Sequence, residues 1–167
     1  MTDQRPGIAA FDALSDDAAY QAIFGCCSSP GLARSLVAGR PYRSVEALLD
    51  AADAALTRLP ESELDLALAG HPRIGDRLHS AVSAREQAGV AGAAEDVRAA
   101  LAEGNRAYEE RFGHIYLVCA SGKSAEELLA LLNARLRNDP ETERRVVRTE
   151  LGKINRIRLH AMLADRP

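Results

Sequence analysis

The sequence has few aromatic residues and no tryptophan: phenylalanine, tyrosine and tryptophan together make up 4% of its 167 residues. Aromatic and β-branched residues favour strands, whereas alanine and leucine, which are abundant here, favour helices. This composition therefore favours a helical chain over a sheet. Apolar residues make up 47% and charged residues 27% of the chain, the balance of an ordinary globular protein.

Long apolar runs are also missing, so no segment is expected to cross a bilayer. The polar start of the chain does not resemble a signal peptide, and the final Ala-Asp-Arg-Pro is not a peroxisomal address. The three cysteines include no Cys-x-x-Cys pair, which fits buried, reduced thiols. These absences predict a cytoplasmic protein without a membrane partner.

Clusters of basic residues and metal-binding motifs are absent as well. The net charge is −3, with arginine and glutamate mixed along the chain, so we expect no nucleic-acid partner. No phosphate-binding glycine loop and no Gly-x-Ser-x-Gly elbow occurs. The four histidines are not spaced as metal ligands are; they are His71, His79, His114 and His160. We therefore expect neither a metal nor a cofactor.

Proline and glycine divide the chain into segments with helical apolar spacing. They predict a single compact all-α domain over residues 1–167, with about eight or nine helices and no significant sheet. Ser15, Ser44 and Ser124 are expected to begin helices as caps, and Gly25 to end the first. The predicted helices include 15–24, 32–38, 45–59, 61–69 and 94–112. Residues 114–119 look β-like, but they lack a partner strand and are interpreted as an extended segment.

The strongest chemical pattern lies in residues 70–90. His71 precedes Pro72, which holds its backbone out of the α region, and Gly75 permits a turn. An imidazole at such a corner suits proton transfer, although a simple turn is the commoner meaning of His-Pro. Ser83 and Glu86 form a Ser-x-x-Glu pattern, which predicts an N-cap and a capping box more often than a catalytic pair.

Two polar residues interrupt apolar helical stripes. Asn105 lies between Leu101 and Tyr108, and its amide either bonds a neighbouring loop backbone or contacts a substrate. Arg158 lies on the stripe of the last helix, where it either faces a cavity with a partner or extends to the rim of the core.

Five blocks of residues follow one another along the chain. They are His-Pro-Arg-Ile-Gly from His71 with Ser-x-x-Glu-Gln-Ala-Gly from Ser83, Asn105-x-x-Tyr108-x-x-x-Phe112-Gly113, Cys119-x-x-Gly122, Arg135-Leu136-x-Asn138-Asp139, and Glu150-Leu151-x-Lys153-Ile154 with Arg158-Leu159. In this order they resemble the OHCU decarboxylases, where OHCU is 2-oxo-4-hydroxy-4-carboxy-5-ureidoimidazoline, an intermediate of urate breakdown. The resemblance covers roughly residues 11–159.

The resemblance implies cofactor-free decarboxylation of OHCU to S-allantoin. It places His71 and Glu86 on the family's catalytic positions and Arg158 on its active-site arginine. His71 would transfer a proton, Glu86 would orient His71 or the ureido group, and Arg158 would hold an anionic oxygen. It also implies a homodimer, and further substrate contacts at Pro72, Ser83, Gln87, Ile115, Tyr116 and Leu117.

One departure from the family pattern keeps other interpretations open. The spacer between Gly75 and Ser83 is shorter than usual, and Val82 stands where an aromatic residue is common. Two alternatives therefore remain: a decarboxylase or isomerase of a related ureide, and a non-catalytic helical binding module that keeps the scaffold. A binding module, unlike the enzyme, would not need the carboxylate of Glu86.

Overall fold

The computed structural model describes residues 6–76 and 81–164, which form ten helices and no strand. The predicted all-α class is confirmed. The sequence did not indicate two short helices, α1 (Pro6–Asp12) and α7 (Ala88–Ala91). They have seven and four residues, too few to show a repeated apolar stripe. In the described ranges, no helix is both long enough and apolar enough to span a membrane.

The contacts within the chain form two compact units, which we call unit 1 (Met1–Gly70 with Gly152–Pro167) and unit 2 (His71–Leu151). Only the described residues of each unit are discussed. The longest helix, α10 (Pro140–Ala164), contributes its first part to unit 2 and its second part to unit 1. The expectation of one domain over 1–167 stays a prediction.

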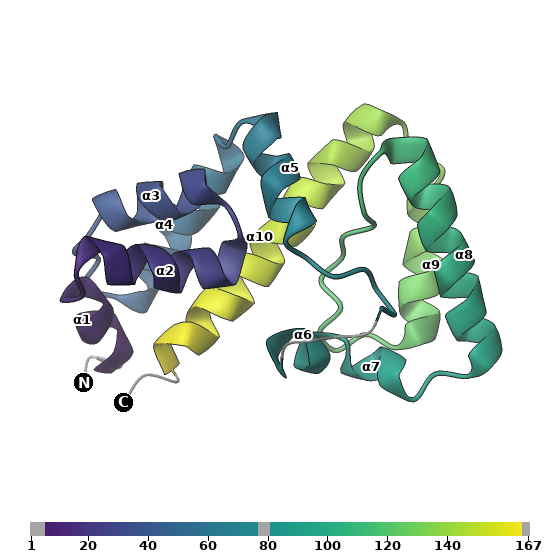
Figure 1. Ribbon diagram of the computed structural model, residues 1–167, viewed down its shortest axis with the longest axis horizontal. Coiled ribbons are helices and arrows are strands. Elements are labelled where there is room, and N and C mark those ends of the chain that lie inside the picture. The colour runs from purple at the N-terminus through teal and green to yellow at the C-terminus, as the bar shows by residue number, and fades with distance from the viewer. Residues whose placement is uncertain (1–5, 77–80, 165–167) are drawn as a thin grey trace. The chain divides into compact units, whose positions relative to one another are not determined.

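Unit 1 is built from helices joined by short connections. In this unit α2 packs against α3, and α3 against α4, as the purple and blue ribbons of Figure 1 show. Its other helices are α1, α5 and the second part of α10, and α5 ends at Ala69, two residues before His71. The bounds are α2 (Asp16–Cys27), α3 (Pro30–Ala38), α4 (Val45–Thr57) and α5 (Glu61–Ala69).

Serine side chains begin three of these helices. Ser15, Ser29 and Ser44 each accept a hydrogen bond from a backbone N–H three residues ahead, at 3.1–3.2 Å. The prediction that Gly25 ends the first helix is wrong, since α2 continues to Cys27 and ends at Ser28, whose φ is 55°. A single glycine costs a helix only about 1 kcal/mol, so it need not end one.

Unit 2 contains longer irregular segments. Its helices are α6 (Ala81–Glu86), α7, α8 (Glu95–Phe112), α9 (Ala125–Arg135) and the start of α10. In Figure 1 α8 and α9 run side by side, and they pack against each other. Residues 114–119 are extended without pairing into a described strand, as predicted. Tyr116 and Val118 of this segment lie in the core with Leu101, Tyr108, Leu128 and Leu132.

Candidate active site

The corner at His71 follows directly from the end of α5. Gly70 is the C-cap of this helix, His71 is buried, and Pro72 is half-buried. The next four residues form a turn in which the N–H of Asp76 donates to the carbonyl of Arg73 at 3.2 Å. Gly75, the third residue of the turn, has a φ of +89°. This combination is typical of a type II turn, which requires glycine at that position.

Two amide side chains hold the middle peptide of this turn. Nδ2 of Asn105 donates to the Ile74 carbonyl at 2.9 Å, and the Gly75 N–H donates to Oε1 of Gln87 at 2.9 Å. Nε2 of Gln87 also donates to the Arg73 carbonyl, at 3.3 Å. Both amides are buried, with 6% of each residue exposed. Of the two alternatives for Asn105, the bond to a loop backbone is therefore the one observed.

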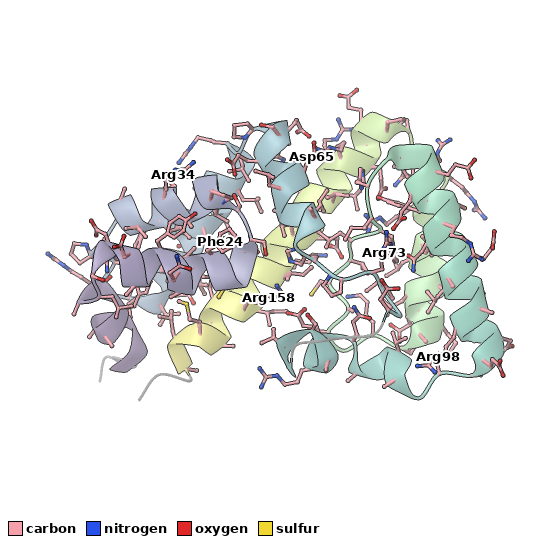
Figure 2. All side chains as sticks on the ribbon, viewed as in Figure 1. Phe24, Arg34, Asp65, Arg73, Arg98 and Arg158 are labelled. Atoms are coloured by element: carbon pink, nitrogen blue, oxygen red, sulfur yellow. The ribbon has the colours of Figure 1, made fainter. Side chains whose placement is uncertain are left out.

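The side chain of Arg73, labelled in Figure 2, adds a second connection from the turn to α8. Its Nε donates to Oε1 of Glu109. This hydrogen bond and the charge of Glu109 raise the pKa of Arg73. Because both side chains are partly exposed, the ion pair adds little stability. It fixes the outer side of the turn.

Two of the predicted site residues, Ser83 and Glu86, lie in α6, and a third, Gln87, follows it directly as the N-cap of α7. Ser83, Glu86 and Gln87 are spaced i, i+3 and i+4, the spacing of residues on one side of a helix. Ser83 is buried and Glu86 is half-buried. The predicted N-cap at Ser83 is wrong, because α6 already includes Ala81 and Val82. The Ser83 carbonyl accepts from the Gln87 N–H at 3.0 Å, as in a helix interior.

The extended segment at 115–117 offers the predicted site backbone groups more than side chains. The Tyr116 side chain is buried in the core, and its hydroxyl donates to the Leu128 carbonyl at 3.0 Å. Burial raises the pKa of this hydroxyl, which stays protonated. The Leu117 carbonyl accepts from Nη1 of Arg135 at 2.5 Å. Ile115 is half-buried.

Arg135 is the centre of a buried polar network that the sequence did not predict. Its Nε donates to Oε1 of Glu143 at 2.6 Å, and the Tyr108 hydroxyl donates to the same oxygen at 2.5 Å. Nδ2 of Asn138 donates to Oε2 of Glu143 at 3.1 Å. Burial lowers the pKa of Arg135, but the hydrogen bond to Glu143 and nearby charges outweigh it, so the pKa is raised.

Three residues of this network, Tyr108, Arg135 and Asn138, fall in two of the blocks quoted above, whereas Glu143 lies outside them. The signal that could have revealed it is the position of Arg135 on the apolar stripe of α9, with Leu128 and Leu132. Burial and a hydrogen bond to Glu143 also raise the pKa of the Tyr108 hydroxyl. The network ties α8, α9 and α10 to the backbone of Leu117.

Arg158, labelled in Figure 2, lies in unit 1, on the C-terminal part of α10. It is half-buried, and its Nη1 donates to the Cys26 carbonyl at 3.2 Å, at the end of α2. This bond orients the guanidinium from one side. The remaining predicted site residues lie in unit 2, from His71 to Leu117.

Within residues 6–76 and 81–164, no three His, Cys, Asp or Glu side chains are grouped to hold a metal ion. His79, one of the histidines considered above, lies outside the described residues.

Comparisons with known proteins place the chain in a family. The family model of OHCU decarboxylase matches residues 12–160. The 2-oxo-4-hydroxy-4-carboxy-5-ureidoimidazoline decarboxylase of Mus musculus is 31% identical over 141 residues, which cover 80% of this chain and 79% of that protein. The uric acid degradation bifunctional protein TTL of Arabidopsis thaliana is 29% identical over 150 residues, covering 84% of this chain but 46% of that protein.

The fold has counterparts among solved structures. A crystal structure of OHCU decarboxylase in the presence of (S)-allantoin aligns with a TM-score of 0.79 and 24% identity, over 91% of this chain and 100% of that chain. A structure of (S)-allantoin synthase aligns with a TM-score of 0.74 and 17% identity, over 93% of this chain and 53% of that chain. At these identities the alignments establish the fold. Since the family model spans nearly all of the sequence, the chain belongs to the OHCU decarboxylase family.

Proposed function

We propose that this protein catalyses the decarboxylation of OHCU to S-allantoin, a step of urate breakdown. The observation that carries the proposal is the family match over residues 12–160, which includes His71, Glu86 and Arg158. The corner supports it: a buried histidine follows a helix end and precedes a turn held by two buried amides.

The reaction needs proton transfer and a place for the electrons of the breaking bond. When the C4 carboxylate leaves as CO2, its bonding electron pair delocalises into the amide and imine system of the ring. A proton then adds to one face of the carbon and gives the S product. Because the substrate accepts the electrons itself, the proposal needs no metal and no organic cofactor.

His71 is the proposed proton-transfer residue, at the substrate hydroxyl or at the nascent carbanion. Glu86 is proposed to orient the imidazole or the ureido group. Arg158 is proposed to hold an anionic oxygen of the substrate. Its planar fork suits a carboxylate or a ring oxygen. Binding that strengthens as charge develops on the ring accelerates the reaction more than binding the departing carboxylate does.

Several further contacts belong to the proposal. Pro72 fixes the corner, and Ser83 and Gln87 are spaced to lie on the same side as Glu86. Tyr116 would contact the substrate through its backbone, because its side chain is buried with its hydroxyl bonded to Leu128. Ile115 and Leu117 are the other proposed contacts of this segment.

We also propose that the protein is a cytoplasmic homodimer that folds as one domain. Gel filtration with light scattering measures the oligomeric state directly. A mass of one 17.9 kDa chain across the working concentration range would reject the homodimer. A single cooperative unfolding transition is expected if units 1 and 2 fold together.

The decisive assay follows the circular dichroism of S-allantoin formed from freshly prepared OHCU. Spontaneous decay gives racemic product and no signal, so the amplitude reports enzymatic turnover. His71→Ala is expected to lower kcat about 10²–10⁴-fold, the usual contribution of a positioned acid or base. A variant with near wild-type rates would remove His71 from the mechanism. A wild-type protein that leaves the product racemic would reject the proposed function.

Arg158→Lys tests the anion-binding role. Lysine keeps the charge but cannot reproduce the planar fork, so we expect a loss of about 10²-fold in kcat/KM with an unchanged far-ultraviolet spectrum. Unchanged kinetics would identify Arg158 as a residue at the rim of the core.

A further inference from the structure

Asn105 combines burial with an unusual pattern of hydrogen bonds. It lies on the core-facing side of α8, one turn after Leu101 and one turn before Tyr108. Its Nδ2 donates to the Ile74 carbonyl at 2.9 Å. Its Oδ1 is buried and has no hydrogen-bond partner among the described residues. One end of the amide therefore holds the turn, while the other end carries a desolvation cost.

The group that Asn105 holds is the middle peptide of the turn at 73–76. Type I and type II turns differ mainly in the orientation of this peptide. Asn105 binds its carbonyl from α8, and Gln87 binds its N–H from the start of α7. The two bonds fix the same orientation from opposite edges. Gly75, with a φ of +89°, is the residue that this orientation requires.

The orientation of this peptide affects the corner because the connection to His71 is short and stiff. Only Pro72 and Arg73 separate His71 from Ile74. The proline ring fixes φ at Pro72 and restricts the backbone of His71. A change in the turn therefore reaches the imidazole with few rotatable bonds to absorb it.

We infer that Asn105 is a positioning residue, which aims the His71 imidazole by holding the Ile74 carbonyl. This inference rests on the proposed function, in which His71 transfers the proton. A leucine of similar size would fill the space, as Leu101 does one turn earlier, but it would leave the Ile74 carbonyl without its donor. The amide at this position therefore serves the geometry of the corner.

The test compares Asn105→Leu with Leu101→Ala. Leu101 is also buried in the same helix, and its apolar side chain cannot form a hydrogen bond to the turn. We expect Asn105→Leu to lower kcat by up to about 10²-fold with little change in KM, because misplacement by about 1 Å has effects of this size. The NMR signals of the His71 ring should shift or broaden. Leu101→Ala should lower the melting temperature but keep kcat per folded molecule and the His71 signals.

Asn105→Asp provides a second variant with the shape of the wild-type side chain. An ionised carboxylate cannot donate to the Ile74 carbonyl, but a protonated one can, and burial favours protonation. The activity of this variant relative to Asn105→Leu should therefore rise as the pH falls. This pH-dependent rescue is not expected if the residue only fills space. If Asn105→Leu does not fold, the activity of Asn105→Asp is compared with that of the wild type over the same pH range.

Three outcomes would overturn the inference. The first is a wild-type kcat with unchanged His71 signals in Asn105→Leu. The second is an equal loss of activity in Asn105→Leu and Leu101→Ala. The third is a change confined to KM, which would make Asn105 a substrate contact. If the wild-type protein forms no S-allantoin, the proposed function fails, and the His71 signals still decide whether Asn105 positions the corner.

Discussion

Units 1 and 2 differ in what they bury. Among the described residues, the buried polar side chains of unit 1 are Ser29 and Asn155. Those of unit 2 are His71, Ser83, Gln87, Asn105, Arg135, Glu143 and Glu150. In unit 1 the ion pairs of Arg156 are partly exposed, such as that with Asp53 at 2.8 Å. Unit 2 places an arginine and a glutamate in its core.

The difference follows from the irregular backbone in unit 2. A buried loop needs partners for its N–H and C=O groups, because an unpaired backbone group is costly away from water. Asn105 and Gln87 supply partners for the turn after His71, and Arg135 supplies one for Leu117. The Cys119 N–H likewise donates to Oε1 of Glu150, at 3.2 Å. In unit 2, buried polar side chains therefore hold the segments that carry the predicted site.

Replacing Arg135 should break this arrangement with the largest effect on stability. Arg135→Met leaves Glu143 buried without its cationic partner, and we expect unfolding to require about 3–5 kcal/mol less. Chemical denaturation measures the loss, and hydrogen exchange should show it in α9 and residues 115–119. The double variant Arg135→Met with Glu143→Leu should recover much of the loss, because no unpaired charge remains.

The matched control is Arg156→Ala in unit 1. Its ion pairs with Glu46, Asp50 and Asp53 are partly exposed, so the expected loss is about 0–1 kcal/mol. A loss at Arg156 equal to that at Arg135 would contradict the comparison between the two units.

Replacing glycine with alanine should change the stability of the protein in opposite directions at Gly75 and at Gly25. An added Cβ meets no atom within 4 Å at either Gly75 or Gly25, so the backbone conformation decides the result. Gly75→Ala puts alanine at a φ of +89°, and we expect a destabilisation of about 1–2 kcal/mol. Gly25→Ala in α2 should stabilise by about 0.5–1 kcal/mol.

Thermal and chemical unfolding of the two glycine variants measure both differences. If Gly75→Ala proves neutral, the turn tolerates another conformation and the two amide bonds do not determine it. A destabilising Gly25→Ala would show that α2 is strained at this residue, although the structure leaves room for the methyl group.

The sequence predicted features that depend on neighbouring residues better than contacts between distant segments. Helix α5 begins and ends at the predicted residues, and the caps at Ser15, Ser44 and Ser124 are confirmed, because these signals are local. The extended form of 114–119 was predicted from its missing partner strand. The roles of Arg135 and Gln87 were not predicted, since they depend on partners that the fold brings from other segments. Ser83 was misread as a cap because its pattern resembles one, although the helix includes earlier residues.

A charged and an uncharged helix cap, Asp139 in unit 2 and Ser44 in unit 1, give the smallest expected effect on stability. Asp139 begins α10: its Oδ1 accepts from the Thr142 N–H at 2.8 Å and its Oδ2 from the Thr142 hydroxyl at 2.9 Å. These hydrogen bonds lower the pKa of Asp139 below its ordinary value of 3.8. Since the folded-state pKa is the lower one, the charged cap stabilises the protein above about pH 4, and this contribution disappears as the pH falls through the folded-state pKa.

Asp139→Asn keeps a capping side chain but removes the titrating charge, so the difference in unfolding free energy from wild type should shrink between pH 7 and pH 3. Ser44→Ala in unit 1 removes an uncharged cap, and its loss of about 1 kcal/mol should be the same at both pH values. Urea denaturation at the two pH values separates the cases. A constant difference for Asp139→Asn would mean that the hydrogen bonds to Thr142 stabilise α10 equally well without the charge.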